Sequence, residues 1–352
     1  MRAAYISADS LAGLVADLRA SAARVVAPAR AADGGVDYRP IERLEEAELN
    51  GAVPRRSLKE LFLPPTEPLL TWKQSGSAVE LSEVPVEFPP QVVLGARPCD
   101  AAAVATLDRV MDWDYHDELW FGRRAATTMV SLLCTTPDET CFCTAVGLGP
   151  DAGKGSDLLL LPVDGGFLAE VLTDKGEALV AAHKDRFAEP GGRVRPEALV
   201  EDMRAKVAAN LAVPMAPITA WLEANFKDPL WEGIAVRCNG CGACAAICPT
   251  CHCFDIVDEP EGVTHGVRRR NWDTCQTARF TVHASGHNPR DGQNARFRQR
   301  VMHKFFIYPA KFGELLCSGC GRCARACPGG QDILETLGRI AALAAGKREA
   351  TA

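Results

Sequence analysis

The residues best suited to chemistry in this sequence are two runs of cysteine with identical spacing. The first begins at Cys238 and ends at Cys248, and the second begins at Cys317 and ends at Cys327. Each follows the order C-x2-C-x2-C-x3-C-P, which is typical of bacterial iron–sulfur proteins. Three thiolates at this spacing can wrap one corner of a cuboidal cluster, and the glycines between them allow the backbone to curl tightly. The two runs therefore predict iron–sulfur chemistry.

The fourth cysteine of each run points away from its own three partners. In two-cluster proteins of this kind it ligates the other cluster. We therefore assign the eight cysteines to two crossed [4Fe–4S] sets, one of Cys238, Cys241, Cys244 and Cys327 and one of Cys317, Cys320, Cys323 and Cys248. Thiolates also bind zinc, and zinc is the alternative, but zinc sites usually use pairs of C-x-x-C rather than a triple followed by Cys-Pro.

Four more cysteines, Cys99, Cys134, Cys141 and Cys143, fall in the first half of the chain. Cys99 and Cys134 each follow an apolar stretch expected to be a strand, and the ends of neighbouring parallel strands meet at one edge of a sheet. Cys99 also lies at the expected start of a helix, whose positive end stabilises a thiolate. We favour a third [4Fe–4S] cluster here over the alternative, which is four buried cysteines that pack as small hydrophobic residues.

Three cysteines remain, Cys251, Cys253 and Cys275, one ligand short of a four-thiolate set. Histidine replaces cysteine in some clusters, so one of His252, His283 and His287 could complete a site. We favour a different interpretation, in which these thiols pack beside the first cluster and tune its potential. If the protein itself reduced a small molecule at an open iron, this incomplete set would be the place.

Length and composition limit the number of domains, the compartment and the kinds of partner to expect. With 352 residues, two domains are expected. Fifteen cysteines without a signal peptide indicate a reducing compartment, so we expect a cytoplasmic protein. No apolar stretch reaches about 18 residues, so we expect no membrane span. The net charge of −6 gives no general reason to expect nucleic acid as a partner.

The order of expected elements predicts an α+β fold. Residues 1–226 should form an α/β domain, in which a buried strand over 91–95 runs into a helix over 101–110 with Asp100 at its N-cap. This domain carries no dinucleotide-binding fingerprint. Residues 227–352 should form a helix-rich, two-cluster ferredoxin-like domain. Between its cysteine runs lies a long insert, in which we expect a hairpin of 254–257 with 267–270 and helices over 274–285 and 294–308.

The insert is basic within an acidic chain. Its cations include Arg268, Arg269, Arg270, Arg279, Arg290, Arg296, Arg298, Arg300, Lys304 and Lys311. They could compensate the negative charge of the clusters or form a docking face for an acidic partner subunit. An iron–sulfur redox sensor that binds nucleic acid through this insert is an alternative function, although we expect no nucleic acid.

Several segments together resemble a known family, the beta subunits of cytoplasmic NAD(P)-linked [NiFe] hydrogenases of the sulfhydrogenase type. The corresponding iron–sulfur subunit of anaerobic sulfite reductase is similar also. The matching segments span most of the chain: 58–59, 64–67, 97–100, 140–143, 153–157, 248–254, 268–275, 303–305 and 317–328. The most specific are Cys-Pro-Thr-Cys-His-Cys-Phe at 248–254 and Trp-Asp-Thr-Cys at 272–275.

The resemblance implies an electron-transfer subunit with no catalytic residues of its own. Such a protein links a flavin- and NAD(P)H-binding subunit to a catalytic hydrogenase subunit, or to sulfite reductase subunits in the alternative complex. The cofactors implied by the residues are two [4Fe–4S] clusters, with a third at the N-terminal cysteines. An electron carrier of this kind needs cofactors set close together rather than a substrate pocket.

Overall fold

The computed structural model describes residues 2–50 and 53–346, and their centre is a seven-stranded mixed sheet. The strands lie in the order β1-β9-β8-β7-β6-β2-β3. They are β1 (Arg2–Ser7), β2 (Arg24–Arg30), β3 (Val36–Pro40), β6 (Gln91–Ala96), β7 (Thr127–Leu132), β8 (Leu158–Val163) and β9 (Gly166–Val171). The four inner strands β2, β6, β7 and β8 run parallel, and antiparallel strands close both edges.

Helices cover both faces of this sheet, which explains why its inner strands are almost continuously apolar. Leu11, Leu14 and Leu18 of α1 (Ala8–Ala20) pack on one face, together with α5 (Asp174–Ala182). The other face is covered by α2 (Lys59–Phe62), α3 (Pro98–Met111) and α4 (Glu118–Ala126). The carboxyl ends of β6 and β7 lead to Cys99 and Cys134 at the same edge of the sheet.

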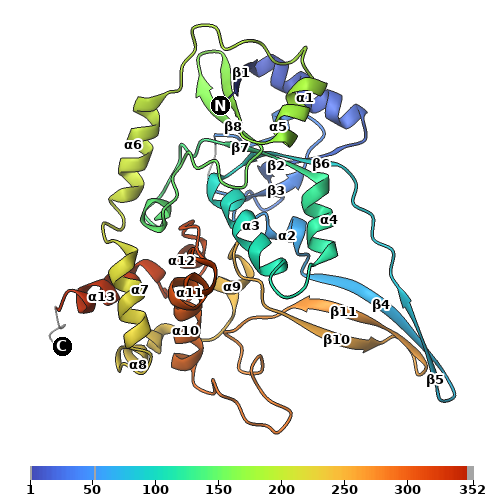
Figure 1. The fold of residues 1–352 in the computed structure, drawn as a ribbon, viewed down its shortest axis with the longest axis vertical. Coiled ribbons are helices and arrows are strands. Elements are labelled where there is room, and N and C mark those ends of the chain that lie inside the picture. The colour runs from blue at the N-terminus through green and yellow to red at the C-terminus, as the bar shows by residue number, and fades with distance from the viewer. Residues whose placement is uncertain (1, 51–52, 347–352) are drawn as a thin grey trace.

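A second, four-stranded antiparallel sheet projects from the body of the molecule as an arm (Figure 1). Its order is β10-β11-β4-β5, with β10 (Phe254–Pro260), β11 (His265–Trp272), β4 (Thr66–Ser75) and β5 (Ala78–Glu83). The hairpin expected over 254–270 is therefore confirmed. Its partners β4 and β5 come from the first half of the chain, so this sheet joins segments from both sides of residue 226.

The cysteine runs lie in a helical region that packs against the carboxyl ends of the parallel strands β6 and β7. Its apolar core is formed by α7 (Met215–Ala224), α8 (Leu230–Ile234), α10 (Gln293–Met302), the π-helical turn His303–Ile307 and α13 (Ile333–Ala344). The helix α6 (Glu197–Ala208) connects this region to the sheet, and α11 (Tyr308–Phe312) follows the π-helical turn. The short helices α9 (Ala243–Ala246) and α12 (Arg322–Arg325) lie inside the two cysteine runs.

The α+β class is confirmed, with the sheet in the N-terminal part and helices around the cysteine runs. Two local expectations were wrong. Residues 274–285 form turns rather than a helix, and Asp100 lies inside the first turn of α3, which has Arg97 at its N-cap. No helix in the described part of the chain is long and apolar enough to cross a membrane.

Candidate iron–sulfur sites

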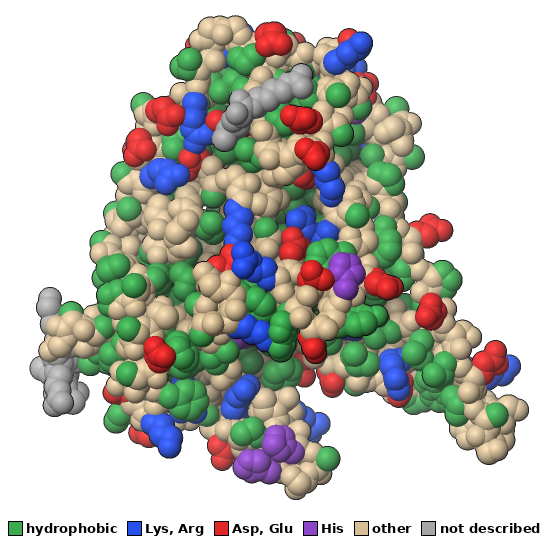
Figure 2. All heavy atoms as spheres, viewed as in Figure 1, with side chains coloured by type: hydrophobic (Ala, Val, Ile, Leu, Met, Phe, Trp, Pro, Cys, Tyr) green, Lys and Arg blue, Asp and Glu red, His purple; other side chains and the backbone are tan. Residues whose placement is uncertain are grey.

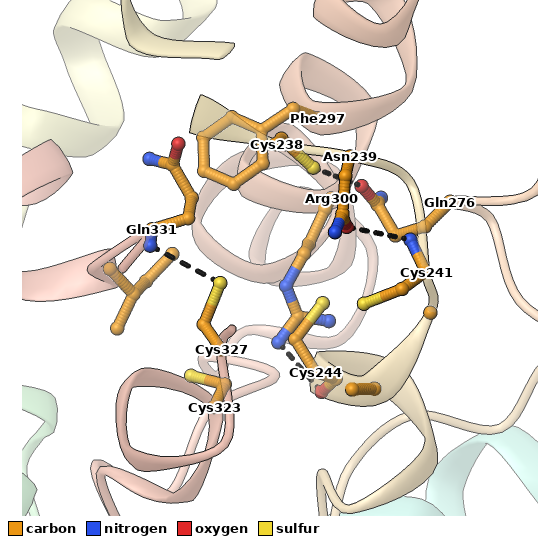
Figure 3. Close-up of a pocket in the computed structure, with 13 residues that line it drawn as sticks. Cys238, Asn239, Cys241, Cys244, Gln276, Phe297, Arg300, Cys323, Cys327 and Gln331 are labelled. Atoms are coloured by element: carbon orange, nitrogen blue, oxygen red, sulfur yellow. Dashed lines mark hydrogen bonds between the residues drawn. The ribbon is translucent and has the colours of Figure 1, made fainter. Parts of the chain in front are cut away.

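Cys238, Cys241, Cys244 and Cys327 line one cavity, which we call the first site (Figure 3). Three of these cysteines come from the first run and the fourth from the end of the second run. The chain can curl around the cavity because Gly240 and Gly242 adopt left-handed φ angles of +73° and +78°. The structure therefore brings together the set that the crossed assignment predicts, although ligation itself stays a prediction.

Cys248, Cys317, Cys320 and Cys323 line a second cavity, the second site. The backbone again turns at two left-handed glycines, Gly319 and Gly321. Neither position has room for a side chain: a Cβ atom on Gly319 would lie 2.5 Å from the backbone of Phe142 and Cys143. The second cysteine run is thus pressed directly against the Cys-x-Cys segment of the N-terminal half.

Cys99, Cys134, Cys141 and Cys143 line a third cavity, the third site. The first two cysteines arrive from the ends of β6 and β7, as the strand pattern predicted. The Cys-x-Cys segment is held in place by a backbone hydrogen bond of 2.8 Å from Phe142 N to Gly319 O. In addition, Asn210 Nδ2 donates to Cys141 O at 2.7 Å. All four sulfur-bearing residues therefore meet in space.

The three sites form a continuous line because neighbouring cavities share walls. Cys323 lines the first and second cavities, and Cys320 lines the second and third. Arg300 also borders both the first and the second cavity. Within the described residues, no group of three or more His, Cys, Asp or Glu side chains is arranged to hold a single metal ion.

Two buried cations, Lys304 and Arg300, lie beside the first and second cavities and indicate that anionic clusters fit there. Lys304 Nζ lies 3.3 Å from Cys248 Sγ and also donates to Thr250 Oγ1 and Leu316 O. Arg300 donates to Cys251 Sγ at 3.3 Å and to Cys244 O at 3.1 Å. Both side chains are about 3% exposed, and no carboxylate pairs with either among the residues described. A buried cation without an anion is strongly destabilising, so thiolate-ligated clusters with net negative charge suit these positions.

Burial opposes the thiolate form of four cysteines in the second and third sites, whereas the contact with Cys251 and the charge of Lys304 lower the pKa of Cys248. Burial raises the pKa of Cys317 and Cys143 to about 12, and that of Cys323 and Cys141 to about 11. Coordination to iron replaces the proton and releases it to solvent. These thiols would therefore be converted to thiolates only as the clusters bind.

Hydrogen-bond donors point at the sulfurs of the first site, where they can stabilise added negative charge. Gln293 Nε2 lies 3.1 Å from Cys238 Sγ. At the other side of the cavity, Gln331 N lies 3.2 Å from Cys327 Sγ. Sequence reasoning missed both residues, because a glutamine carries no motif of its own.

Cys251 interacts with Cys248 of the second site, whereas Cys275 interacts with Cys244 of the first site, so the expected place beside the first cluster holds for only part of this group. The ring centroid of His252 lies 5.6 Å from that of His303, and burial lowers the pKa of His252 to about 4, so the ring is neutral. The other proposed histidines, His283 and His287, are exposed, and their rings meet edge to face.

Five of the basic residues of the insert fall into two groups. Arg268, Arg269 and Arg270 form ion pairs with carboxylates of this chain. Arg300 and Lys304 instead contact cysteine sulfurs, in agreement with the charge-compensation interpretation. On the face shown in Figure 2, basic and acidic side chains are interspersed. Sequence reasoning missed a third buried cation near these cysteines, Lys59, because it lies far away in the chain.

Comparison with known proteins gives two matches. Residues 237–331 match the family model described as a 4Fe-4S dicluster domain. The chain is also 32% identical over 252 residues to sulfhydrogenase 2 subunit beta of Pyrococcus furiosus, an alignment that covers 71% of this chain and 73% of the relative. No solved structure matches the chain.

Proposed function

The chain belongs to the family of sulfhydrogenase beta subunits, and on this basis we propose that it passes electrons between a flavin- and NAD(P)H-binding subunit and a catalytic [NiFe] hydrogenase subunit. The bound clusters would supply one-electron oxidation and reduction. The chain would supply their thiolate ligands, the spacing between them and the charges that set their potentials. It would bind neither the nucleotide nor hydrogen itself.

The observation that carries this proposal is the shared walls of the three cysteine sites. Electron tunnelling slows steeply with distance, so a carrier must hold its centres close together. Cys320 and Cys323 each border two cavities, which makes the three sites a continuous line from the helical region to the edge of the central sheet. Such a line has two ends, as expected for a subunit between two partners.

For the ligands we propose the crossed sets in the first and second sites. Cys238, Cys241, Cys244 and Cys327 would hold one [4Fe–4S] cluster, and Cys248, Cys317, Cys320 and Cys323 the other. The two cavities and the buried cations beside them support this assignment. Arg300, which borders both cavities, would stabilise electrons on either cluster.

For the third site we propose a third [4Fe–4S] cluster, held by Cys99, Cys134, Cys141 and Cys143. Support comes from the convergence of three separate segments on one cavity and from its contact with the second cysteine run through Gly319. Residues 1–226 would then serve as the docking body that carries electrons toward a partner subunit. Residues 227–352 would form the two-cluster body. The arm sheet, which contains strands from both parts of the chain, would join the docking body to the two-cluster body.

The proposal is tested by anaerobic co-expression with the neighbouring subunits. We expect the complex to couple hydrogen oxidation to NAD(P)+ reduction, and NAD(P)H to reduce the clusters of this chain only when the flavin subunit is present. Cluster reduction linked to sulfite rather than to hydrogen would assign the chain to a sulfite reductase complex instead. If the clusters bind but neither partner reduces them, the role as a carrier is wrong.

A further inference from the structure

Two of the cysteines outside the three sites form a close pair at the base of the arm sheet. Cys253 immediately precedes β10 and Cys275 follows β11 by three residues. The antiparallel ladder pairs Phe254 with Trp272 and continues through a hydrogen bond of 3.0 Å from Asp273 N to Cys253 O. A turn closed by Thr277 N and Thr274 O then brings Cys275 back toward Cys253.

The contact between these two residues is direct. The thiols of Cys253 and Cys275 lie within interaction distance of each other beyond the end of the ladder. The thiol–thiol contact lowers the pKa of Cys275 to about 6 and raises that of Cys253, so one member of the pair is a thiolate and the other keeps its proton. Gln276 Nε2 also donates to Cys275 Sγ, at 3.4 Å.

The surroundings of the pair are cationic. Lys59 is about 3% exposed, and its Nζ lies 3.7 Å from the centroid of the Trp272 ring and donates to Ala246 O at 3.1 Å. Burial lowers the pKa of Lys59, and the nearby cysteines, Cys253 among them, oppose that shift. The positive charges of Arg300 and Lys304 both lower the pKa of Cys275. Cations of this kind favour the thiolate form, which is the reactive form in disulfide chemistry.

The pair also adjoins the proposed electron path. Two residues before Cys253, Cys251 interacts with the thiol of Cys248, a predicted ligand of the second site. In an extended segment, alternate side chains point to opposite sides. His252 and Phe254 line a groove between the arm sheet and α4. The side chains of Cys251 and Cys253 therefore point to the opposite side, where Cys251 Sγ contacts Arg300 near the second site.

We propose that Cys253 and Cys275 form a dithiol/disulfide redox centre that exchanges electrons with the second site. On oxidation an S–S bond forms between the Cys275 thiolate and the Cys253 sulfur, the proton of Cys253 leaves to solvent, and two electrons pass one at a time to oxidised iron–sulfur clusters of this chain. On reduction two electrons from those clusters break the S–S bond, and Cys253 takes up one proton while Cys275 returns to the thiolate. The inference rests on the proposed function, because the clusters are the electron donors and acceptors.

This centre would connect one-electron carriers to a two-electron store. Reduced clusters whose potential lies below that of the disulfide can open it. The dithiol would therefore dominate while reductant is supplied. The disulfide would form as the electron path becomes oxidised.

The experiment maps thiols in the complete chain at fixed potentials. Anaerobic samples are poised with mediators at a series of potentials that runs from fully reduced to fully oxidised clusters. Each sample is quenched in acid, alkylated, reduced, alkylated with a heavier reagent, and digested for mass spectrometry. In an aliquot digested without the reduction step, we expect a cross-linked peptide pair between Cys253 and Cys275 only at the oxidising end. Both residues should take the heavy label together, as a two-electron transition, while Cys251 keeps the light label at every potential.

Variants separate this inference from the proposed function. Cys275→Ser should abolish the cross-linked peptide and leave the iron content unchanged, and Cys251→Ser should leave the cross-link in place. Loss of about four irons in Cys275→Ser would make this residue a cluster ligand and overturn the dithiol assignment. Full iron content with no cross-link at any potential would overturn it too, while leaving the electron-carrier proposal intact. An iron-free protein would instead contradict the proposed function.

Discussion

Arg322 and Asp100 form a fully buried, bidentate ion pair, with Nη1 and Nη2 lying 2.7 and 2.6 Å from the two carboxylate oxygens. Asp100 follows Cys99 in the first turn of α3, whereas Arg322 lies between Cys320 and Cys323 in the second cysteine run. Tyr38 Oη also donates to Asp100, at 2.8 Å. This pair therefore joins the third site to the second site across 222 residues of sequence.

The first prediction concerns this ion pair. Asp100→Asn keeps the shape of the side chain but leaves the Arg322 guanidinium buried without its anion, which should destabilise the protein by about 3–5 kcal/mol. We expect a lower urea midpoint under anaerobic conditions. As a control, Asp258→Asn removes the exposed partner of Arg268 and should leave the midpoint nearly unchanged. Equal midpoints for the two variants would show that the buried pair does not hold the sites together.

The second prediction concerns Lys304, whose ammonium lies 3.3 Å from Cys248 Sγ. Reduction adds negative charge to a cluster, so a nearby cation raises its potential. Lys304→Met should lower the midpoint potential of the second site by on the order of 100 mV. EPR-monitored redox titration measures the shift. Lys311→Met, which removes an exposed cation above Trp113, should shift no potential. An unchanged potential in Lys304→Met would exclude the lysine as a determinant.

The third prediction tests how closely the second cysteine run must approach the Cys-x-Cys segment. In Gly319→Ala, the new Cβ would lie 2.5 Å from backbone atoms of Phe142 and Cys143, and a φ of +63° adds strain. We expect loss of iron from both the second and the third sites. Gly338→Ala is the control, because this helical position has open space around it and should be neutral or slightly stabilising. Full iron content in Gly319→Ala would show that the segments can separate.

Local signals in the sequence predicted the α+β class and which cysteines lie around a common cavity. Cysteine spacing specifies which thiols can share a cluster, and apolar strands ending at Cys99 and Cys134 indicate that these residues meet at one sheet edge. The hairpin of β10 and β11 followed from its alternating pattern. All of these are local signals, carried by residues close together in the chain.

The parts that sequence reasoning missed depend on distant contacts. Asp100 looks like a helix N-cap until Arg322 is placed beside it. Lys59 is an ordinary lysine in sequence, yet it is buried against Trp272 by the pairing of β4 with β11. Residues 274–285 have helical composition, but contacts with the cysteine runs, such as that of Gln276 Oε1 with Cys238 Sγ at 3.8 Å, accompany turns in place of the helix.

The fourth prediction isolates the third site. The Cys141→Ser, Cys143→Ser double variant removes two of its four thiols, and we expect loss of about four irons with the EPR signals of the other two clusters retained. The matched control is Cys251→Ser, which removes a thiol outside the three sites and should retain all iron. If the double variant keeps its full iron content and stays folded, the four cysteines are packing residues and the electron path has two centres in this chain.

The central claim is that this chain holds a line of iron–sulfur clusters, and it is tested most directly by counting iron and acid-labile sulfide in protein purified without oxygen. Three occupied sites predict about twelve iron and twelve sulfide per chain, and the two crossed sites alone predict about eight of each. Bound zinc without labile sulfide would contradict the claim.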